Sequence, residues 1–299
     1  MEAHSTAPGH PLLGGGGNLR RRRRTNQIVQ WASTVAALLA VAVLVLVVGS
    51  VAVHGASAIS FSFLTNSGAG QTFGAVGSGI GNSIVGTLLL IAMAALMAVP
   101  IGLLIAIYTS EFAGPRVSNV VRFALDILNG IPTIVVGIFI FGLLVVAHGQ
   151  SAIAGSIALA IVMLPIVART AQEVLALVPS SLKEGAAALG VARWRTVLRV
   201  VLPTAAGGLL TGALLAVARV AGETAPLLLV CGIEPPIVST DVTHAVASLP
   251  VTIFVLSEQP LPAAHDQAWA TALVLILFVL LLNVVARFFH SRSRKRLGG

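Results

Sequence analysis

Two opposite charges stand four residues apart inside the apolar segment LLAVARVAGETAPLLLV, residues 214–230. If this segment is helical, Arg219 and Glu223 share one face, where a guanidinium and a carboxylate can pair. A charge near the centre of a bilayer costs about 2.5–3.5 kcal/mol on insertion scales, so both side chains are expected to face protein or water. The chemistry available to them is ion pairing or anion recognition.

The charged pair has a structural and a functional interpretation. Structurally, it is an ion pair, with Asp126 as a third member, that fixes helix packing. Functionally, it is an anion site on a transport pathway, because a guanidinium stays charged and binds oxyanions through two N–H groups. Gly222 and Pro226 weaken the helix beside it, and transporters place substrate at interrupted helices. We favour the pathway role, and Glu223 can hold Arg219 until an anion competes for it.

Asp126 lies in the stretch FALDILNGIPT, close to Gly130 and Pro132. Its carboxylate is either a member of the Arg219 network or a partner for backbone groups freed by the Gly–Ile–Pro break, and the sequence favours neither. The break itself predicts a bend in the helix.

The composition indicates whether these helices lie in water or in a lipid bilayer. The chain has 299 residues, of which 57% are hydrophobic and only 9% charged, whereas about a quarter of a soluble chain is charged. We therefore expect an all-α integral membrane protein. A single cysteine excludes an intrachain disulfide, and the seven histidines are scattered, so no metal site or cofactor is predicted.

Six apolar runs reach about the 20 residues that cross a hydrocarbon core, and each is predicted to be a helix because lipid cannot satisfy backbone polar groups. They lie at about 31–53, 83–108, 121–147, 151–171, 204–231 and 267–289. The expected organisation is a disordered basic tail (1–27), a first helix with its loop (28–79), a core with the other five helices (80–291), and a basic tail (292–299).

The distribution of positive charge fixes the expected topology. With loops assigned alternately to the two sides, every Lys and Arg except Arg219 falls on one side, and 54–80, 148–150 and 232–266 contain none. The positive-inside rule then places both termini in the cytoplasm. The net charge of +8 thus indicates membrane topology, and the run Arg20–Arg24 indicates orientation rather than a nucleic-acid partner.

The loop at 177–203 carries its own folding signals. Ser181 and Glu184 match a capping box, so a short helix is expected to begin after Pro179. Gly190 suits the left-handed residue that ends a helix, and a second, basic helix follows. Pro203 is expected to kink the start of the next apolar helix.

This loop resembles the EAA loop of ABC-importer permeases, E-A-A-x3-G-x9-I-x-L-P. Gly185 replaces the usual Ala, and Val200 the usual Ile. The resemblance implies a coupling helix that docks in a cleft of an ATP-hydrolysing subunit. The implied coupling residues are Glu184, Gly185, Ala186, Gly190, Leu202 and Pro203. A plain cytoplasmic helical hairpin is the alternative, but it leaves the long spacing from Gly190 to Leu202 unexplained.

Further segments narrow the resemblance to the A-type permease subunit of the Pst phosphate system. They are NGIPTIVVGIF (129–139), ARTAQEVLALVP (168–179), ARVAGETAPLLLV (218–230), SLPVTIF (248–254) and AWATALVLILFVLLLNVVAR (268–287). The resemblance covers about residues 80–290. It implies a type I ABC importer permease in the cytoplasmic (inner) membrane that translocates inorganic phosphate, with Arg219, Glu223 and Asp126 as candidate pathway residues.

The resemblance also implies partners. These are two ATP-binding subunits, a second permease of the C type, and an extracytoplasmic phosphate-binding protein, besides membrane lipid. The chain has no G-x4-G-K-[ST] motif of its own, so ATP hydrolysis is expected on another chain. The mildly acidic loop at 232–266, with Glu234, Asp241, Glu258 and Asp266, is either a dock for the binding protein or simply a solvated loop.

Three alternatives stay open. A permease for sulfate or molybdate would carry the same EAA loop. An intramembrane enzyme could use Glu223 and Asp126 as acid and base, but it would leave that loop unexplained. A membrane scaffold without transport is the third.

Overall fold

The computed structural model describes residues 16–68, 79–232, 238 and 240–297, and these are almost entirely helical. The contacts divide the chain into two units, Met1–Ser50 and Val51–Gly299. The first contains most of helix α1 (Gly16–Gly55). Residues 1–15 of the expected tail lie outside the described residues. Residues 16–27 are helical, so the expectation of a disordered tail was wrong there; arginine is a good helix former and continues the apolar helix towards the N-terminus.

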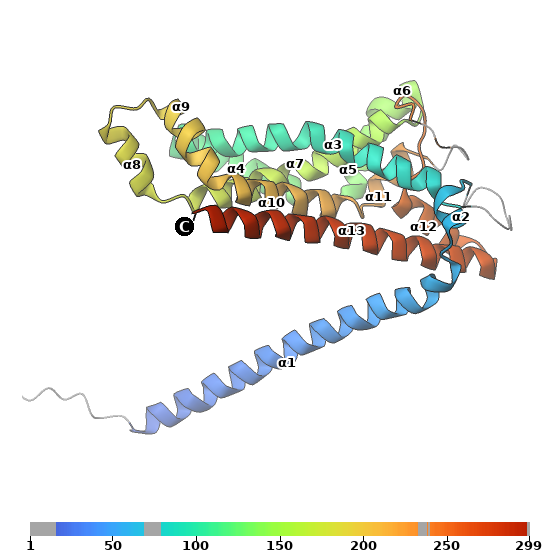
Figure 1. Ribbon diagram of the computed structural model, residues 1–299, viewed down its shortest axis with the longest axis horizontal. Coiled ribbons are helices and arrows are strands. Elements are labelled where there is room, and N and C mark those ends of the chain that lie inside the picture. The colour runs from blue at the N-terminus through green and yellow to red at the C-terminus, as the bar shows by residue number, and fades with distance from the viewer. Residues whose placement is uncertain (1–15, 69–78, 233–237, 239, 298–299) are drawn as a thin grey trace, which may run out of the picture. The chain divides into compact units, whose positions relative to one another are not determined.

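The second unit is built on four long helices in the described part of the chain: α3 (Gly81–Ile107), α7 (Ala152–Ala176), α10 (Leu202–Val220) and α13 (Pro262–Leu297). Figure 1 shows them running lengthwise, and α7 packs against α3 and α10 while α10 packs against α13. The shorter helices are α2 (Phe61–Thr65), α4 (Pro115–Gly130), α5 (Thr133–Ile140), α6 (Val146–His148), α8 (Ser180–Ala188), α9 (Arg193–Thr196), α11 (Ala225–Val230) and α12 (Leu249–Glu258). Three π-helical turns, Tyr108–Phe112, Phe141–Val145 and Val197–Val201, join some of them.

The two ends of the second unit differ in which loops they gather. Helices α8 and α9 lie at one end in Figure 1, and α2, α6 and α12 lie at the other. At the first end, Lys183 of the 177–203 loop pairs with Glu111 of the turn after α3. At the second, the amides of Ser151 and Ala152 bond to carbonyls of Val230 and His244. Loops assigned by sequence to one side of a membrane therefore meet each other.

Five described helices are long and apolar enough to cross a membrane, and α4 with α5 and α6 make a sixth if that bent pair is one span. The expected helix at 121–147 is bent by 91° between Gly130 and Thr133, as the Gly–Ile–Pro stretch predicts. The expected helix at 204–231 starts near its predicted position, since α10 begins at Leu202, but it ends early, at Val220. The sequence analysis also placed α12, a ten-residue apolar helix, in a loop.

The core depends on close approach between α3 and α7. Small residues face each other there, and Ala94, Ala98 and Ala158 are at most 1% exposed. Gly155 of α7 lies against Leu90 of α3 and the buried Cys231. Without a hydrophobic driving force in lipid, helices associate through such close van der Waals contact between small side chains.

We expect Gly155→Val to destabilise this packing. A Cβ atom at Gly155 would overlap the Cys231 sulfur and approach Leu90 Cδ2 to 3.0 Å. Overpacking of this kind costs about 1–3 kcal/mol, so the melting temperature in detergent should fall. Gly142→Val is the matched control, because a Cβ there meets no atom within 4 Å. Equal melting temperatures for the two variants would contradict the packing described here.

Candidate functional site

The 177–203 loop begins with helix α8 directly after Pro179, as predicted. The capping box was wrong, however. Pro179 is the N-cap and no side chain caps the helix, so Ser181 lies within the first turn. A residue already in helical geometry cannot take the extended backbone that a capping serine needs.

Helix α8 ends as the sequence predicts. Gly190 has φ +70°, the left-handed conformation that glycine adopts without a Cβ penalty. The Gly190 amide donates to the carbonyl of Ala187 and the Val191 amide to that of Ala186, each at 3.0 Å. These two bonds form a Schellman motif, which satisfies the last carbonyls of α8 and turns the chain back towards the bundle.

The second half of the loop runs without interruption into the bundle. Helix α9, the π-turn Val197–Val201 and α10 form one 28-residue span, Arg193–Val220. The expected irregularity lies before Pro203 rather than at it: the Leu202 amide bonds back five residues to Val197, and Pro203 falls in the first turn of α10. Pro203 has no N–H to donate, and it follows directly on the π-turn that already interrupts the α-helical hydrogen-bond pattern.

The predicted coupling residues therefore occupy two places. Glu184, Gly185, Ala186 and Gly190 lie on or at the end of α8, and none of the α8 residues is buried. Leu202 and Pro203 lie at the start of α10. Large apolar side chains are exposed around Gly190: Leu189 is 83% and Trp194 54% exposed. An exposed apolar patch at the tip of a helical hairpin is typical of a docking surface.

Arg219 and Glu223 do not share a helix face. Helix α10 ends at Val220, residues 221–224 form an irregular connection, and α11 begins at Ala225 with Pro226 in its first turn. Among the described residues neither side chain makes a hydrogen bond or ion pair, so the expected Arg219–Glu223 pair was wrong. The interruption that Gly222 and Pro226 predict is present, and it is what separates the two charges.

Asp126 has a different partner from the one expected. It forms an ion pair with Arg169 of α7, and Arg169 Nη1 also lies 3.5 Å from Gln172 Oε1. The proposed link from Asp126 to Arg219 was therefore wrong. Arg169 was counted only as a cytoplasmic charge, although it lies within the predicted helix at 151–171 and within α7 (Ala152–Ala176). Its position within a helix was the signal for an internal role.

The two interrupted helices meet each other. A Cβ at Gly137 of α5 would come within 2.7 Å of Pro226 Cα, so the start of α11 lies directly against α5. Helix α11 also packs against α7. The break after Arg219 and the bend after Gly130 are thus followed by segments that cover one another.

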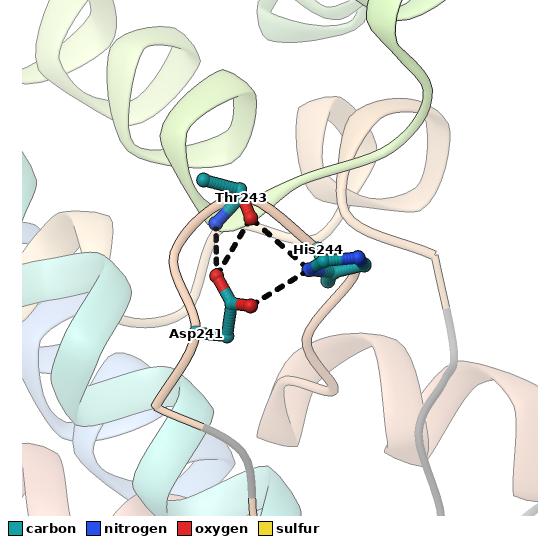
Figure 2. Close-up of polar contacts among 3 residues, drawn as sticks. All are labelled: Asp241, Thr243 and His244. Atoms are coloured by element: carbon teal, nitrogen blue, oxygen red, sulfur yellow. Dashed lines mark hydrogen bonds and ion pairs between the residues drawn. The ribbon is translucent and has the colours of Figure 1, made fainter.

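The loop at 232–266 is organised around the beginning of α7. Figure 2 shows Asp241, Thr243 and His244 grouped together; His244 Nδ1 lies 2.9 Å from Asp241 Oδ2. Hydrogen bonds from the hydroxyl and the amide of Thr243 hold the pKa of the Asp241 carboxyl below its usual value. The carbonyls of Val242 and His244 accept the first amides of α7. Glu234 lies outside the described residues, and Glu258 and Asp266 are exposed.

No cluster of three or more metal-ligating side chains occurs in the described part of the chain. The candidate site has an exposed helix, α8, at one end, a structured loop at the other, and the charged residues Arg219 and Glu223 between them.

Comparison with known proteins identifies the family to which this chain belongs. The model of the family described as "Binding-protein-dependent transport system inner membrane component" matches residues 98–299. Phosphate transport system permease protein PstA 1 of Mycobacterium tuberculosis is 42% identical over 223 residues, which are 73% of this chain and 72% of that protein. PstA of Yersinia pestis is 43% identical over 73% of this chain and 74% of its own. PstA of Mycobacterium leprae is 37% identical over 88% and 87%.

Solved structures share the fold at lower identity. A bacterial alginate ABC transporter chain superimposes with a TM-score of 0.62 at 15% identity, covering 89% of this chain and 96% of that one. A chain of the inward-facing MetNI methionine ABC transporter gives a TM-score of 0.58 at 17% identity, covering 72% and 94%. These likenesses establish the type I permease fold.

We expect Gly190→Val to loosen the end of α8. A β-branched side chain at φ +70° costs about 1–2 kcal/mol, and relieving that strain breaks the Schellman bonds. The measurement is hydrogen exchange of the amides of residues 187–191, which should accelerate. Gly185→Ala is the control within α8, since it favours helix and its Cβ meets no atom within 4 Å. Unchanged exchange in Gly190→Val would contradict the assignment.

Proposed function

This chain belongs to the binding-protein-dependent transport permeases, in the group of the phosphate permease PstA, and we propose that it is the permease subunit of an ATP-driven phosphate importer. The observation that carries the proposal is the identity of about 40% with phosphate transport permeases over nearly three quarters of the chain. A permease of this family works with an ATPase and a substrate-binding protein, and is not itself an enzyme.

The coupling surface supports a division of labour between chains. The sequence has no nucleotide-binding loop, while α8 and the exposed Leu189 and Trp194 offer an apolar surface at one end of the bundle. In the proposed mechanism, two ATPase subunits close on ATP, and a cleft on one of them moves α8. The residues proposed to form the docking unit are Glu184, Gly185, Ala186 and Gly190, with Leu202 and Pro203 carrying movement into α10.

The proposed topology places α8, α9 and both termini in the cytoplasm. Two independent features support it. Every Lys and Arg other than Arg219 falls on one side of the sequence-derived topology. The turn after α3 and the 177–203 loop, which that topology puts on the same side, are joined by the Lys183–Glu111 pair.

The proposed substrate pathway includes Arg219 and Glu223 as separate groups. Arg219 lies in the last turn of α10, is exposed, and pairs with no described acid, so its guanidinium is available to an oxyanion. Glu223 follows in the connection to α11 and is half-buried. Substrate sites of transporters favour such interrupted helices. Asp126 is engaged by Arg169, so the proposal no longer includes it in this group.

We also propose two further partners, a second permease and a phosphate-binding protein. A single bundle with one exposed coupling helix supplies half of a pathway, so we propose a second permease of the C type beside it. The phosphate-binding protein would dock at the opposite end, where Asp241 and His244 are exposed on a loop tied to α7.

We expect the assembled complex to take up phosphate in preference to other oxyanions. Vesicles holding this chain with its ATPase, second permease and binding protein are supplied with ATP and radiolabelled phosphate. Unlabelled phosphate should abolish uptake of label, while equal sulfate or molybdate should not. Uptake of sulfate or molybdate instead would agree with the proposed importer role but contradict phosphate as its substrate. No specific observation favours that alternative or an intramembrane enzyme.

Arg219→Gln should reduce phosphate uptake by about tenfold to a hundredfold, because a hydrogen bond to a charged group contributes about 1.5–3 kcal/mol. Pull-down of the ATPase confirms assembly. Arg287→Gln is the control, since it removes an exposed arginine near the end of α13. Uptake equal to wild type in the Arg219 variant would sink the pathway role.

A further inference from the structure

The turn that ends α3 buries an acid. In the π-turn Tyr108–Phe112 the side chain of Glu111 is only 5% exposed. An ionised carboxylate removed from water is costly unless it is paired and hydrogen-bonded. Its partner is Lys183 of α8, whose Nζ lies 2.5 Å from Glu111 Oε1. We call Glu111 and Lys183 the anchor pair.

A second contact joins the same two places. The guanidinium of Arg193, the first residue of α9, lies 5.8 Å from the centre of the Phe112 ring. Glu111 and Phe112 are consecutive residues of the π-turn, and each is contacted by a cation of the loop, Lys183 of α8 or Arg193 of α9. The loop at 177–203 is fastened to the end of α3 at two points.

The π-turn Tyr108–Phe112 is also bound to other helices of the bundle. Gln172 of α7 donates to Thr109 Oγ1 at 2.8 Å, and Ser118 of α4 donates to the Thr109 carbonyl at 2.7 Å. Gln172, Thr109 and Ser118 are all buried. The turn therefore moves with α7 and α4 as well as with α3.

The anchor pair joins α8 to a part of the bundle that is distant from it along the chain. Helix α8 is joined along the chain to α7 through residues 177–179 and to α10 through α9. Its backbone contacts are with α9 and the π-turn Val197–Val201. Helix α3 lies more than 70 residues earlier in the sequence, since Lys183 and Glu111 are 72 residues apart. Among the described ion pairs and side-chain hydrogen bonds, Lys183–Glu111 links α8 itself to the turn that ends α3, while Arg193 adds a contact from α9.

We propose that the anchor pair is a positioning contact that passes movement of α8 to α3, so that ATP hydrolysis and transport stay coupled. This inference rests on the proposed function for its transport readout. Glu111 and Lys183 touch neither ATP nor substrate; they set where α8 stands relative to α3. Losing the pair leaves α8 attached by the chain to α7 and α10, which allows ATP turnover to continue without a concerted movement of the bundle.

The test compares substrate moved with ATP hydrolysed in the complete complex. The variants are Lys183→Met, the double variant Glu111→Gln with Lys183→Met, and the charge swap Glu111→Lys with Lys183→Glu. The double variant leaves no unpaired buried charge, so it folds where the single one fails to. Arg116→Met is the control, because it removes a neighbouring exposed positive charge. ATPase pull-down verifies assembly of each.

We expect the ratio of phosphate uptake to ATP hydrolysed to fall by about tenfold in the first two variants, within the range for residues of a coupling network. The swap should recover most of the ratio, and the control should match wild type. A ratio equal to wild type in the double variant, or no recovery in an assembled swap, overturns the proposal.

A second readout separates this inference from the proposed substrate. Hydrogen exchange of the amides of α8 in the purified complex requires no phosphate. It should accelerate in the double variant and slow again in the swap. If wild-type vesicles take up another anion, the exchange pattern and the ratio for that anion still test the anchor pair. Unchanged exchange in the double variant counts against it.

Discussion

The constraint on which this structure depends is that backbone and charged groups in a hydrocarbon solvent must be satisfied by the protein itself. Where helices are continuous, the constraint is met within each segment. Where they break, described amides bond back within the same segment: Ile131 to Ile127, Gly222 to Arg219 and Glu223 to Val220. The segments that follow the two breaks, α5 and α11, pack against each other. Each interruption is thus followed by a short helix that is covered by the helix after the other interruption.

Close packing of small residues makes this mutual cover possible. Gly137 admits the start of α11 to α5, and Gly155 admits Cys231 to α7. Along α3 and α7, alanines and glycines replace the large side chains that a soluble core would use. Helices held by contact of this kind, rather than by a hydrophobic driving force, can shift relative to one another while their surfaces remain complementary. Such a property suits a bundle that alternates between two openings.

Features governed by local chemistry could be predicted from the sequence. The long apolar runs, the bend at Gly130–Pro132 and the left-handed Gly190 depend on a few neighbouring residues, and the structure contains all three. Local signals failed at the Ser181–Glu184 capping box and at residues 16–27. The other errors in the site concern groups with more than one possible partner. Arg219 and Glu223 were paired by helical spacing, but the helix ends at Val220. For Asp126 the sequence left the Arg219 network and freed backbone groups equally open, and tertiary packing brings it to Arg169 instead. The spacing of 72 residues hid Glu111 and Lys183 altogether, because no local pattern relates them.

The ion pairs of the bundle show how differently placed charges serve one protein. The side chains of Asp126 and Arg169 are 52% and 34% exposed, so this pair is accessible from outside the chain. Glu111 is buried, and its dependence on Lys183 is correspondingly strict. A buried ion pair suits a contact that must persist through every transport cycle, whereas an exposed charge suits a group that meets passing ions. In the proposed mechanism the buried carboxylate of Glu111 fixes the coupling loop, and Arg219, which has no described partner, is available to an anion.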